Sequence, residues 1–422
     1  MKLWIVSVGE PLPVDGVNTR LRRMGNLASY ASQNDITVEW FSVSFDHYKK
    51  VQRCKGTKDY QINPNFTLHL VDSIAYKRNI SFARIKHHKE AGKSIYNRMN
   101  DLEKPDVIIA SMEPLEVSKA AVEYAQKNDI PCIVDVRDLW PEIYYDVIPK
   151  SLHWVLNFYV KACAKTLNYT MGNCTSIVGL SNGFLEYGLK YAKRNRTDND
   201  AVYPIAYPNN DYSAYKFKLQ EYWGNYGIKE NDFLVIFLGN FGDQFKFGEI
   251  IEAAKYFENN QNIKFILCGN GKHEEEVKRT AGSNVIIPGW IEKEQIVSLM
   301  ANASIGIAPY IDSMNYRLNT PNKFGEYLSA GLPIAVSVSG EMEKLLKEYD
   351  CGSVFRTSKD LINIIDNYCN DKSLLSQHSI NARKLYEDMF NADSSNQKLL
   401  NHIIKIANTK EEIKNVSLPK NS

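Results

Sequence analysis

The stretch that decides the fold is "TPNKFGEYLSAGLPIAVS", residues 320–337. Thr320 is a good helix N-cap and Pro321 suits the first helical position, so a helix is predicted to begin here. Gly331 and Pro333 end that helix, and the "IAVS" that follows is typical of a buried strand. A helix that leads directly into a buried strand is the repeating unit of a parallel α/β sheet.

The same pattern recurs along the chain in two series. Apolar runs stand at 3–8, 36–42, 67–71, 106–110, 132–136 and 176–180 in the first series, and at 233–238, 264–268, 284–288, 304–309 and 334–338 in the second. Longer helix-like segments separate these runs, and such alternation predicts parallel sheets that are covered by helices on both faces. Two series in a chain of 422 residues predict two doubly wound α/β domains.

The boundary between the domains is predicted near residue 206. Residues 206–228 carry proline, asparagine and tyrosine without a clear period, which is typical of a linker. The N-terminal domain then comprises residues 1–206 and the C-terminal domain residues 207–384. Residues 385–422 are predicted to form closing helices and a polar, frayed tail.

The composition excludes several classes of protein. The chain is 44% hydrophobic and 24% charged, as soluble globular proteins are, and its net charge of +2 gives no nucleic-acid signal. Seven cysteines show no ligand-like spacing and eight histidines are scattered, so neither a metal, a cofactor nor a disulfide framework is expected. No apolar run is long enough for a signal peptide or a membrane span, which predicts a cytoplasmic protein.

Four successive strands of the second series end in glycines or a polar loop. Ligands of open α/β sheets bind beyond these carboxyl ends, where glycine lets a ligand approach the backbone. Each glycine taken alone is more simply a strand end. The set that includes Gly242 and Gly269, together with Lys246 and Lys323, favours a ligand site.

Lys323 stands in the first turn of the predicted helix, where the helix dipole disfavours a cation. A phosphate docked on this helix end would explain the lysine, because the free N–H groups and the ammonium would bind it together. Lys246 could reach the same anion. Glu326 offers a carboxylate that suits the two hydroxyls of a ribose, and phosphate plus ribose describes a nucleotide. The alternative is a solvent-exposed Lys323 that pairs with Glu326 at i, i+3.

The segment "NKFGEYLSAGLPI" resembles the retaining glycosyltransferases of family 4. This resemblance implies the GT-B fold, with two doubly wound, Rossmann-like domains that face each other across a cleft and a C-terminal helix that returns to the N-terminal domain. Glu326 matches the second of two family glutamates and is implied to hold the ribose. Leu318 replaces the first, with Asn319 and Thr320 as nearby substitutes.

The resemblance also implies a diphosphate site. Asn240 stands where the family usually has an arginine, and the spacing from there to Lys246 is one residue longer than usual. Lys323 is therefore expected to take over part of the arginine's role. In the N-terminal half, Gly16 matches the family's glycine loop, and Arg20, in the predicted helix that carries Arg20, Arg22 and Arg23, is a candidate anion ligand.

The segment "RDLWP", residues 137–141, resembles a subgroup of surface-polysaccharide, capsule and O-antigen assembly enzymes. Asp138 is the best candidate to meet the acceptor hydroxyl, and Arg137 has a structural alternative in pairing with Asp135 or Asp138. The expected catalytic residues are Asp138, Lys323 and Glu326, and the expected donor-binding residues are Gly16, Arg20, Asn240, Gly242, Lys246, Gly269, Asn319, Thr320, Asn322, Lys323 and Glu326.

Together these features predict a metal-independent, retaining hexosyl- or N-acetylhexosaminyltransferase. Its donor would be UDP- or GDP-linked, and its acceptor a lipid-linked glycan. Two alternatives remain: a nucleotide-sugar epimerase or hydrolase of the same fold, and a non-catalytic nucleotide-sugar-binding subunit.

The basic residues 76–98 and the aromatic and lysine residues of 150–165 predict peripheral contact with the anionic inner face of the cytoplasmic membrane. The alternative is a basic helix with a buried aromatic stripe.

Overall fold

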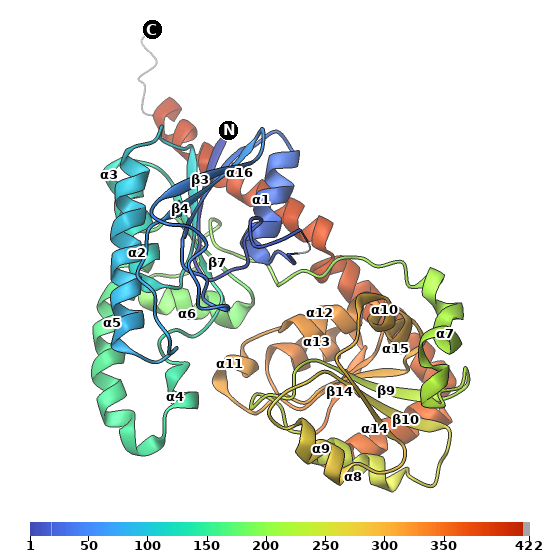
Figure 1. Ribbon diagram of the computed structural model, residues 1–422. Coiled ribbons are helices and arrows are strands. Elements are labelled where there is room, and N and C mark those ends of the chain that lie inside the picture. The colour runs from blue at the N-terminus through green and yellow to red at the C-terminus, as the bar shows by residue number, and fades with distance from the viewer. Residues whose placement is uncertain (18, 417–422) are drawn as a thin grey trace. The chain divides into compact units, whose positions relative to one another are not determined.

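The computed structural model describes residues 1–17 and 19–416, and these form two compact units. One unit comprises Met1–Tyr203 and the segment from Asn396 onward, and the other comprises Pro204–Ser395. Each unit is a twisted sheet with helices on both faces (Figure 1). The predicted pair of doubly wound α/β domains is thereby confirmed.

The N-terminal unit is built on an eight-stranded sheet in the order β3-β4-β2-β1-β5-β6-β7-β8. Its strands are β1 (Lys2–Val6), β2 (Thr37–Val43), β3 (Lys58–Asn63), β4 (Phe66–Val71), β5 (Val107–Ser111), β6 (Cys132–Val136), β7 (Ser176–Gly179) and β8 (Ala201–Val202). Neighbouring strands run parallel except for the antiparallel pair β3 and β4. The edge strands β3 and β8 are additions to the predicted series.

Helices cover both faces of this sheet. They are α1 (Arg23–Gln33), α2 (Phe82–Asn100), α3 (Leu115–Lys127), α4 (Tyr144–Val147), α5 (His153–Asn173), α6 (Asn182–Ala192) and α16 (Ala392–Val416). Alternate side chains of β1 point to opposite faces, as the pleat requires. Leu3 and Ile5 share a core with α1 and with Leu400 of α16, whereas the ring of Trp4 lies 5.3 Å from that of Tyr124 of α3.

The last helix returns to the N-terminal unit, as the resemblance to the GT-B fold implied. Leu399, Leu400, Ile403 and Ile406 are buried in the core beside α1. The helix continues through much of the segment that was expected to be frayed, as far as Val416. The rest of the predicted tail, residues 417–422, lies outside the described residues.

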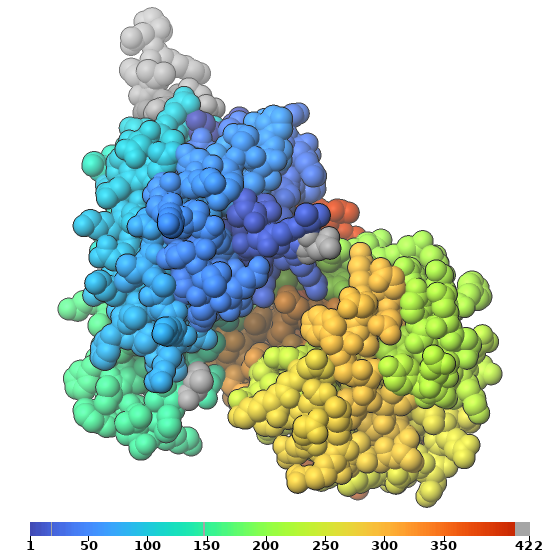
Figure 2. Space-filling model, viewed as in Figure 1, coloured from blue at the N-terminus to red at the C-terminus, as the bar shows by residue number. Residues whose placement is uncertain are grey.

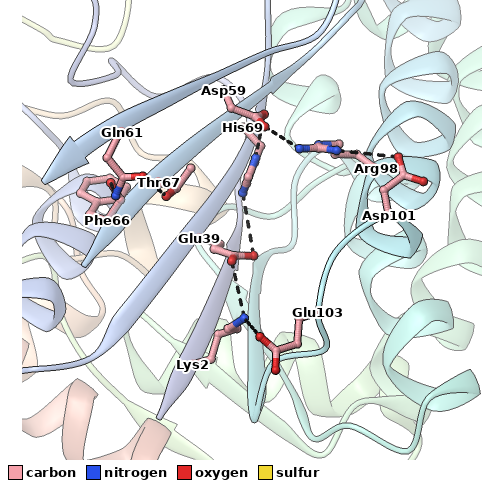
Figure 3. A network of polar contacts seen from close by, with 10 residues as sticks. All are labelled: Lys2, Glu39, Asp59, Gln61, Phe66, Thr67, His69, Arg98, Asp101 and Glu103. Carbon is pink, nitrogen blue, oxygen red and sulfur yellow. Dashed lines mark hydrogen bonds and ion pairs between the residues drawn. The ribbon is translucent and has the colours of Figure 1, made fainter. Parts of the chain in front are cut away.

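A chain of polar contacts crosses four neighbouring strands of this sheet, from β1 to the edge strand β3 (Figure 3). The Lys2 ammonium lies 3.8 Å from the Glu39 carboxylate, which in turn lies 3.8 Å from His69 Nε2. On its other side His69 Nδ1 lies 2.8 Å from Asp59, which also pairs with Arg98 of α2. These groups bridge β1, β2, β4 and β3, so we assign them a structural role.

The C-terminal unit is built on six parallel strands in the order β11-β10-β9-β12-β13-β14. Its strands are β9 (Phe233–Leu238), β10 (Ile263–Cys268), β11 (Val285–Gly289), β12 (Ile305–Ala308), β13 (Ile334–Val336) and β14 (Gly352–Val354). Its helices are α7 (Leu219–Trp223), α8 (Gly248–Tyr256), α9 (Glu274–Thr280), α10 (Lys293–Asn302), α11 (Met314–Arg317), α12 (Asn322–Ser329), α13 (Glu341–Tyr349), α14 (Ser358–Asn370) and α15 (Lys372–Leu385).

The segment predicted to be a linker is instead part of the C-terminal unit. Residues 213–226 form short helices, and the side chains of Leu219, Trp223 and Ile228 are buried in that unit's core. The sequence pattern hid this because the helices are too short to show a period. The chain passes from one unit to the other at Tyr203 and Pro204.

Three further features bear on the predicted class. All seven cysteines are free, and Cys132, Cys268 and Cys351 are buried. No helix within residues 1–17 and 19–416 is both long and apolar enough to span a bilayer. No group of three or more histidine, cysteine, aspartate or glutamate side chains in the described part of the chain is arranged to hold a metal ion.

Candidate functional site

Glycines bring the carboxyl ends of β9 and β10 into close contact. Gly239, Gly269 and Gly271 have φ angles of +152°, +131° and +156°, a region that side chains disfavour. A Cβ on Gly269 would overlap the carbonyl oxygen of Gly239, and one on Gly271 would lie 2.7 Å from the amide nitrogen of Phe241. Only glycine fits at these positions, and the result is a bare backbone surface at the end of the sheet.

Gly269→Ala is expected to lower the free energy of unfolding by roughly 2–4 kcal/mol, because it adds backbone strain and an overlap with Gly239. The control is Gly248→Ala, since a Cβ there meets no atom within 4 Å and the residue begins a helix. We expect the control to change stability by less than about 1 kcal/mol. Urea denaturation followed by tryptophan fluorescence measures both, and equal stabilities would contradict the tight packing of the two strand ends.

Lys323 is buried directly above this glycine surface. The residue is only 8% exposed, and its ammonium lies 4.7 Å from the ring centre of Phe237 and 5.1 Å from that of Phe245. A Cβ on Gly239 would overlap the Lys323 Nζ atom. Among the described residues no carboxylate lies within ion-pairing distance of it, and burial lowers the pKa of Lys323 to about 8. A buried cation without an anionic partner points to an anionic ligand.

The alternative in which Lys323 is exposed and pairs with Glu326 is therefore wrong. Glu326 is partly buried, and its Oε1 atom accepts a hydrogen bond of 2.9 Å from the Tyr207 hydroxyl. Tyr207 is itself fixed, because its carbonyl oxygen accepts a 2.9 Å hydrogen bond from Tyr386. Within residues 1–17 and 19–416 no hydrogen-bond donor reaches the second carboxylate oxygen of Glu326.

The start of α12 differs from the prediction. The helix begins at Asn322, so Pro321 occupies the N-cap position and no side chain caps the helix. Thr320 lies one residue too early to act as the cap. Its hydroxyl and the Oδ1 atom of Asn319 are buried, and neither has a hydrogen-bond partner among the residues that the structure describes. Buried polar atoms without partners are rare, so these two beside a helix N-terminus support a bound anion or polyol.

The remaining predicted donor residues of this unit lie in the loop after β9 and at the start of α12. Asn240 is exposed, and its Oδ1 accepts a 2.6 Å hydrogen bond from Gln244. Gly242 is partly buried in the same loop, and Asn322 is exposed in the first turn of α12. The Lys246 side chain is exposed, and its backbone N–H donates to Pro309 O at 2.8 Å, which ties this loop to the end of β12.

In the N-terminal unit, the helix after β1 begins later than predicted. It begins at Arg23, so Arg20 is an exposed loop residue and not one turn into a helix. The turn at Gly16, where φ is +147° and Thr19 N–H donates to Gly16 O at 3.1 Å, extends the loop. Arg23 has a structural role, because its guanidinium binds Asp135 at 2.9 and 3.0 Å.

The alternative in which Arg137 pairs with Asp135 or Asp138 also differs from the structure. Asp135 is occupied by Arg23, and Arg137 forms an ion pair with Glu10 and a 3.2 Å hydrogen bond with Ser111. Asp138 is partly buried just beyond the end of β6. Each of these groups lies at the carboxyl edge of the N-terminal sheet, where ligands of parallel sheets bind.

Sequence reasoning missed Glu113, which follows β5. Its Oε1 atom is buried, and within the described part of the chain it has no hydrogen-bond partner. Burial, and then the charge of Asp138, raise the pKa of Glu113 well above its ordinary value, against the effect of Arg137. The signal that could have found it is an acidic residue directly after an apolar run. The raised pKa shifts this carboxyl toward its protonated form, which donates as well as accepts hydrogen bonds.

Glu113 lines a pocket of about 170 Å³ at this edge of the sheet, the polar pocket. Three histidines also line it: His47 and the adjacent pair His87 and His88. Burial lowers the pKa of each, to about 4 for His47 and about 3 for His88. At neutral pH these histidines therefore offer uncharged donors and acceptors beside the aromatic rings of Tyr48, Tyr76 and Trp140, a lining that suits a sugar.

The alternative of a buried aromatic stripe in residues 150–165 is wrong for two of its members. Trp154 is 65% exposed and Phe158 is 69% exposed, whereas Tyr159 is partly buried. Phe82, at the start of the basic helix α2, is 91% exposed. The basic surface therefore does carry exposed aromatic side chains.

Residues 220–385 match the model of the family described as glycosyl transferases group 1. The comparison with curated proteins gave no match. Among solved structures, sucrose-phosphate synthase from Thermosynechococcus elongatus has a TM-score of 0.66 at 12% identity, with 94% of this chain and 97% of that chain covered.

Two other solved structures are similar over nearly their whole length. HepE from Anabaena, in complex with UDP-glucose, has a TM-score of 0.62 at 14% identity, with 98% of this chain and 100% of that chain covered. WaaG, a glycosyltransferase involved in lipopolysaccharide biosynthesis, has a TM-score of 0.64 at 16% identity, with 96% and 99% covered. Identities this low establish the fold alone. The chain has the GT-B fold, and its residues 220–385 carry the match to the glycosyl transferases group 1 family.

Proposed function

We propose that this protein is a metal-independent, retaining glycosyltransferase of the family 4 type. It transfers a hexosyl or N-acetylhexosaminyl group from a UDP- or GDP-linked donor to a lipid-linked glycan in cell-surface polysaccharide assembly. The observation that carries the proposal is the Lys323 ammonium, buried without an ion pair above the glycine surface of β9 and β10. The family match of residues 220–385 supports the same donor class.

The C-terminal unit holds the donor in this proposal. Lys323 and the first N–H groups of α12 bind the diphosphate, with the exposed Lys246 and Asn240 at its outer side. Glu326 accepts the ribose hydroxyls on the carboxylate oxygen that Tyr207 leaves free. Asn319 and Thr320, whose buried oxygens lack partners, take hydroxyls of the donor sugar in place of the glutamate that Leu318 replaces.

In the N-terminal unit Asp138 orients the acceptor, and the polar pocket beside it receives the acceptor sugar. The acceptor hydroxyl attacks the anomeric carbon on the face from which the diphosphate leaves. The bond from the anomeric carbon to the diphosphate breaks as the new glycosidic bond forms, and a diphosphate oxygen takes the hydroxyl proton. No protein base is needed, and Lys323 compensates the charge that develops on the diphosphate.

The proposed location is the cytoplasmic face of the membrane. Exposed Trp154, Phe158 and Phe82 lie among basic residues, and such a surface suits anionic headgroups.

A panel of UDP- and GDP-sugars, screened by thermal shift and then by release of free UDP or GDP, tests the function. One donor is expected to raise the melting temperature and to release its nucleotide with added lipid-linked glycan, in EDTA as in buffer. A donor converted to its epimer, or hydrolysed at the full rate without acceptor, would instead identify an epimerase or hydrolase. Donor binding without turnover for any acceptor would identify a non-catalytic subunit, which is the second candidate function. The observation that favours this candidate is Leu318, which stands where the family has a glutamate.

A further inference from the structure

An apolar groove of about 260 Å³ lies in the N-terminal unit beside the polar pocket. Figure 2 shows the segment that begins α2, in blue, against the teal segment of α4 and α5. The groove is open, since Ile80, Leu152 and Val155 are 57%, 50% and 48% exposed. Its aliphatic lining consists of Ile80, Ile85, Ile148, Leu152, Val155 and Leu156.

Arg84 stands where the groove meets the polar pocket, because it lines both, as do His88 and Trp140. Its guanidinium lies 5.3 Å from the ring centre of Trp140 and donates a 2.8 Å hydrogen bond to Asn79 O. Within the described residues it forms no ion pair, and no acidic side chain lines the groove. An unpaired cation between an apolar and a polar cavity is complementary to an amphiphile with an anionic group at its centre.

We propose that this groove and Arg84 bind the apolar chain and the phosphate of a prenyl or alkyl phosphate, with Arg84 on the phosphate. The inference rests on the proposed function and deepens it, because it assigns the lipid part of the acceptor to named residues. The chain occupies the groove, the phosphate meets Arg84, and the sugar enters the polar pocket toward Glu113 and Asp138. The neutral histidines suit the sugar, and Arg84 supplies the one charge the phosphate needs.

Calorimetric titration of the full-length protein with farnesyl phosphate, below its micelle concentration, tests the site. Farnesol and inorganic phosphate are the matched probes, each lacking one half of the ligand. We expect saturable binding of farnesyl phosphate, with farnesol and phosphate each at least about tenfold weaker. Arg84→Gln and Leu152→Asp are each expected to raise the Kd for farnesyl phosphate at least about tenfold.

The control variant is Lys86→Gln, which removes the same charge from an exposed position of α2 that lines neither cavity. It should change the Kd less than about twofold. An Arg84→Gln variant that binds like the wild type would overturn the proposal. A second result would also overturn it: no saturable binding of farnesyl phosphate, together with binding to phosphatidylglycerol vesicles that Arg84→Gln and Lys86→Gln weaken equally. That result would identify a general membrane-binding surface and not a site for one phosphate. The titration needs no donor and no turnover, so its failure leaves nucleotide-sugar transfer standing, and the reverse also holds.

Discussion

Lys323→Met is expected to weaken UDP binding by about 10–100-fold and to change uridine binding by less than about threefold. The physical reason is that the proposed site places the ammonium on the diphosphate and not on the nucleoside. Calorimetric titration with UDP and with uridine measures the two losses, and GDP with guanosine serves if the donor carries guanine. Lys246→Met serves as a comparison: it removes the same charge from the exposed outer side of the proposed diphosphate site, where solvent screens it, so a smaller loss of UDP affinity is expected. Equal losses for UDP and uridine would refute the diphosphate assignment of Lys323.

The same substitution is expected to stabilise the protein without ligand. Burial lowers the pKa of Lys323 from 10.5 to about 8. Between these values the unfolded chain binds more protons than the folded chain, so the stability of the wild type rises with pH across this window. Below pH 8 both states are protonated and the full cost of burying the charge applies, on the order of 3 kcal/mol. Methionine removes this cost.

Urea denaturation at pH 7 and pH 10 checks this expectation. The stability advantage of Lys323→Met over the wild type should be largest at pH 7 and should shrink toward pH 10. Lys246→Met, at an exposed position, should show no such dependence on pH. On this account Lys323 lowers the stability of the free protein and raises its affinity for an anionic ligand. Such a trade between stability and function is common at binding sites.

The strands of both sheets were predictable because buried parallel strands are continuous apolar runs. The two runs at β9 and β6 coincide with the observed strands, Phe233–Leu238 and Cys132–Val136. The edge strands β3 and β14 escaped detection. The sequence of β3 is "KDYQIN", whose residues are mostly polar and are exposed or partly exposed, and β14 has only three residues. In β3 the exposed polar residues interrupt the apolar run, and β14 is too short to show one.

The grouping of residues around Lys323 was largely visible in the sequence, because strand-end glycines, a helix N-terminus and Lys323 lie in short segments with a known spatial relation. The burial of Lys323 was not visible, since it depends on Phe237 and Phe245 packing around the ammonium. The polar pocket was invisible for the same reason. His47 and His87 are 40 positions apart in the sequence and come together only because the sheet order brings their segments together. Their ring centres lie 5.9 Å and 5.1 Å, respectively, from that of Tyr76.

Glu326→Gln should produce the opposite pattern to Lys323→Met. Because the carboxylate is assigned to the ribose, UDP and uridine should lose affinity by the same factor, about 10–100-fold, when its charged acceptor is replaced by a neutral amide. The discrimination between UDP and 2′-deoxy-UDP should shrink toward unity in this variant, since the hydroxyl that distinguishes them loses its partner. Titrating the wild type and the variant with UDP and with 2′-deoxy-UDP separates the contribution of the contact between Glu326 and the 2′-hydroxyl from any general loss of affinity.

Tyr207→Phe is the matched control for Glu326. It removes the 2.9 Å hydrogen bond that fixes the carboxylate and leaves the charge in place. Because the carboxylate remains available to the ribose, we expect a loss of less than about fivefold and preserved discrimination against 2′-deoxy-UDP. If Glu326→Gln kept full discrimination, Glu326 would only be an anchor for Tyr207. The reciprocal responses of Lys323 and Glu326 therefore separate a phosphate site from a ribose site within a single turn of α12.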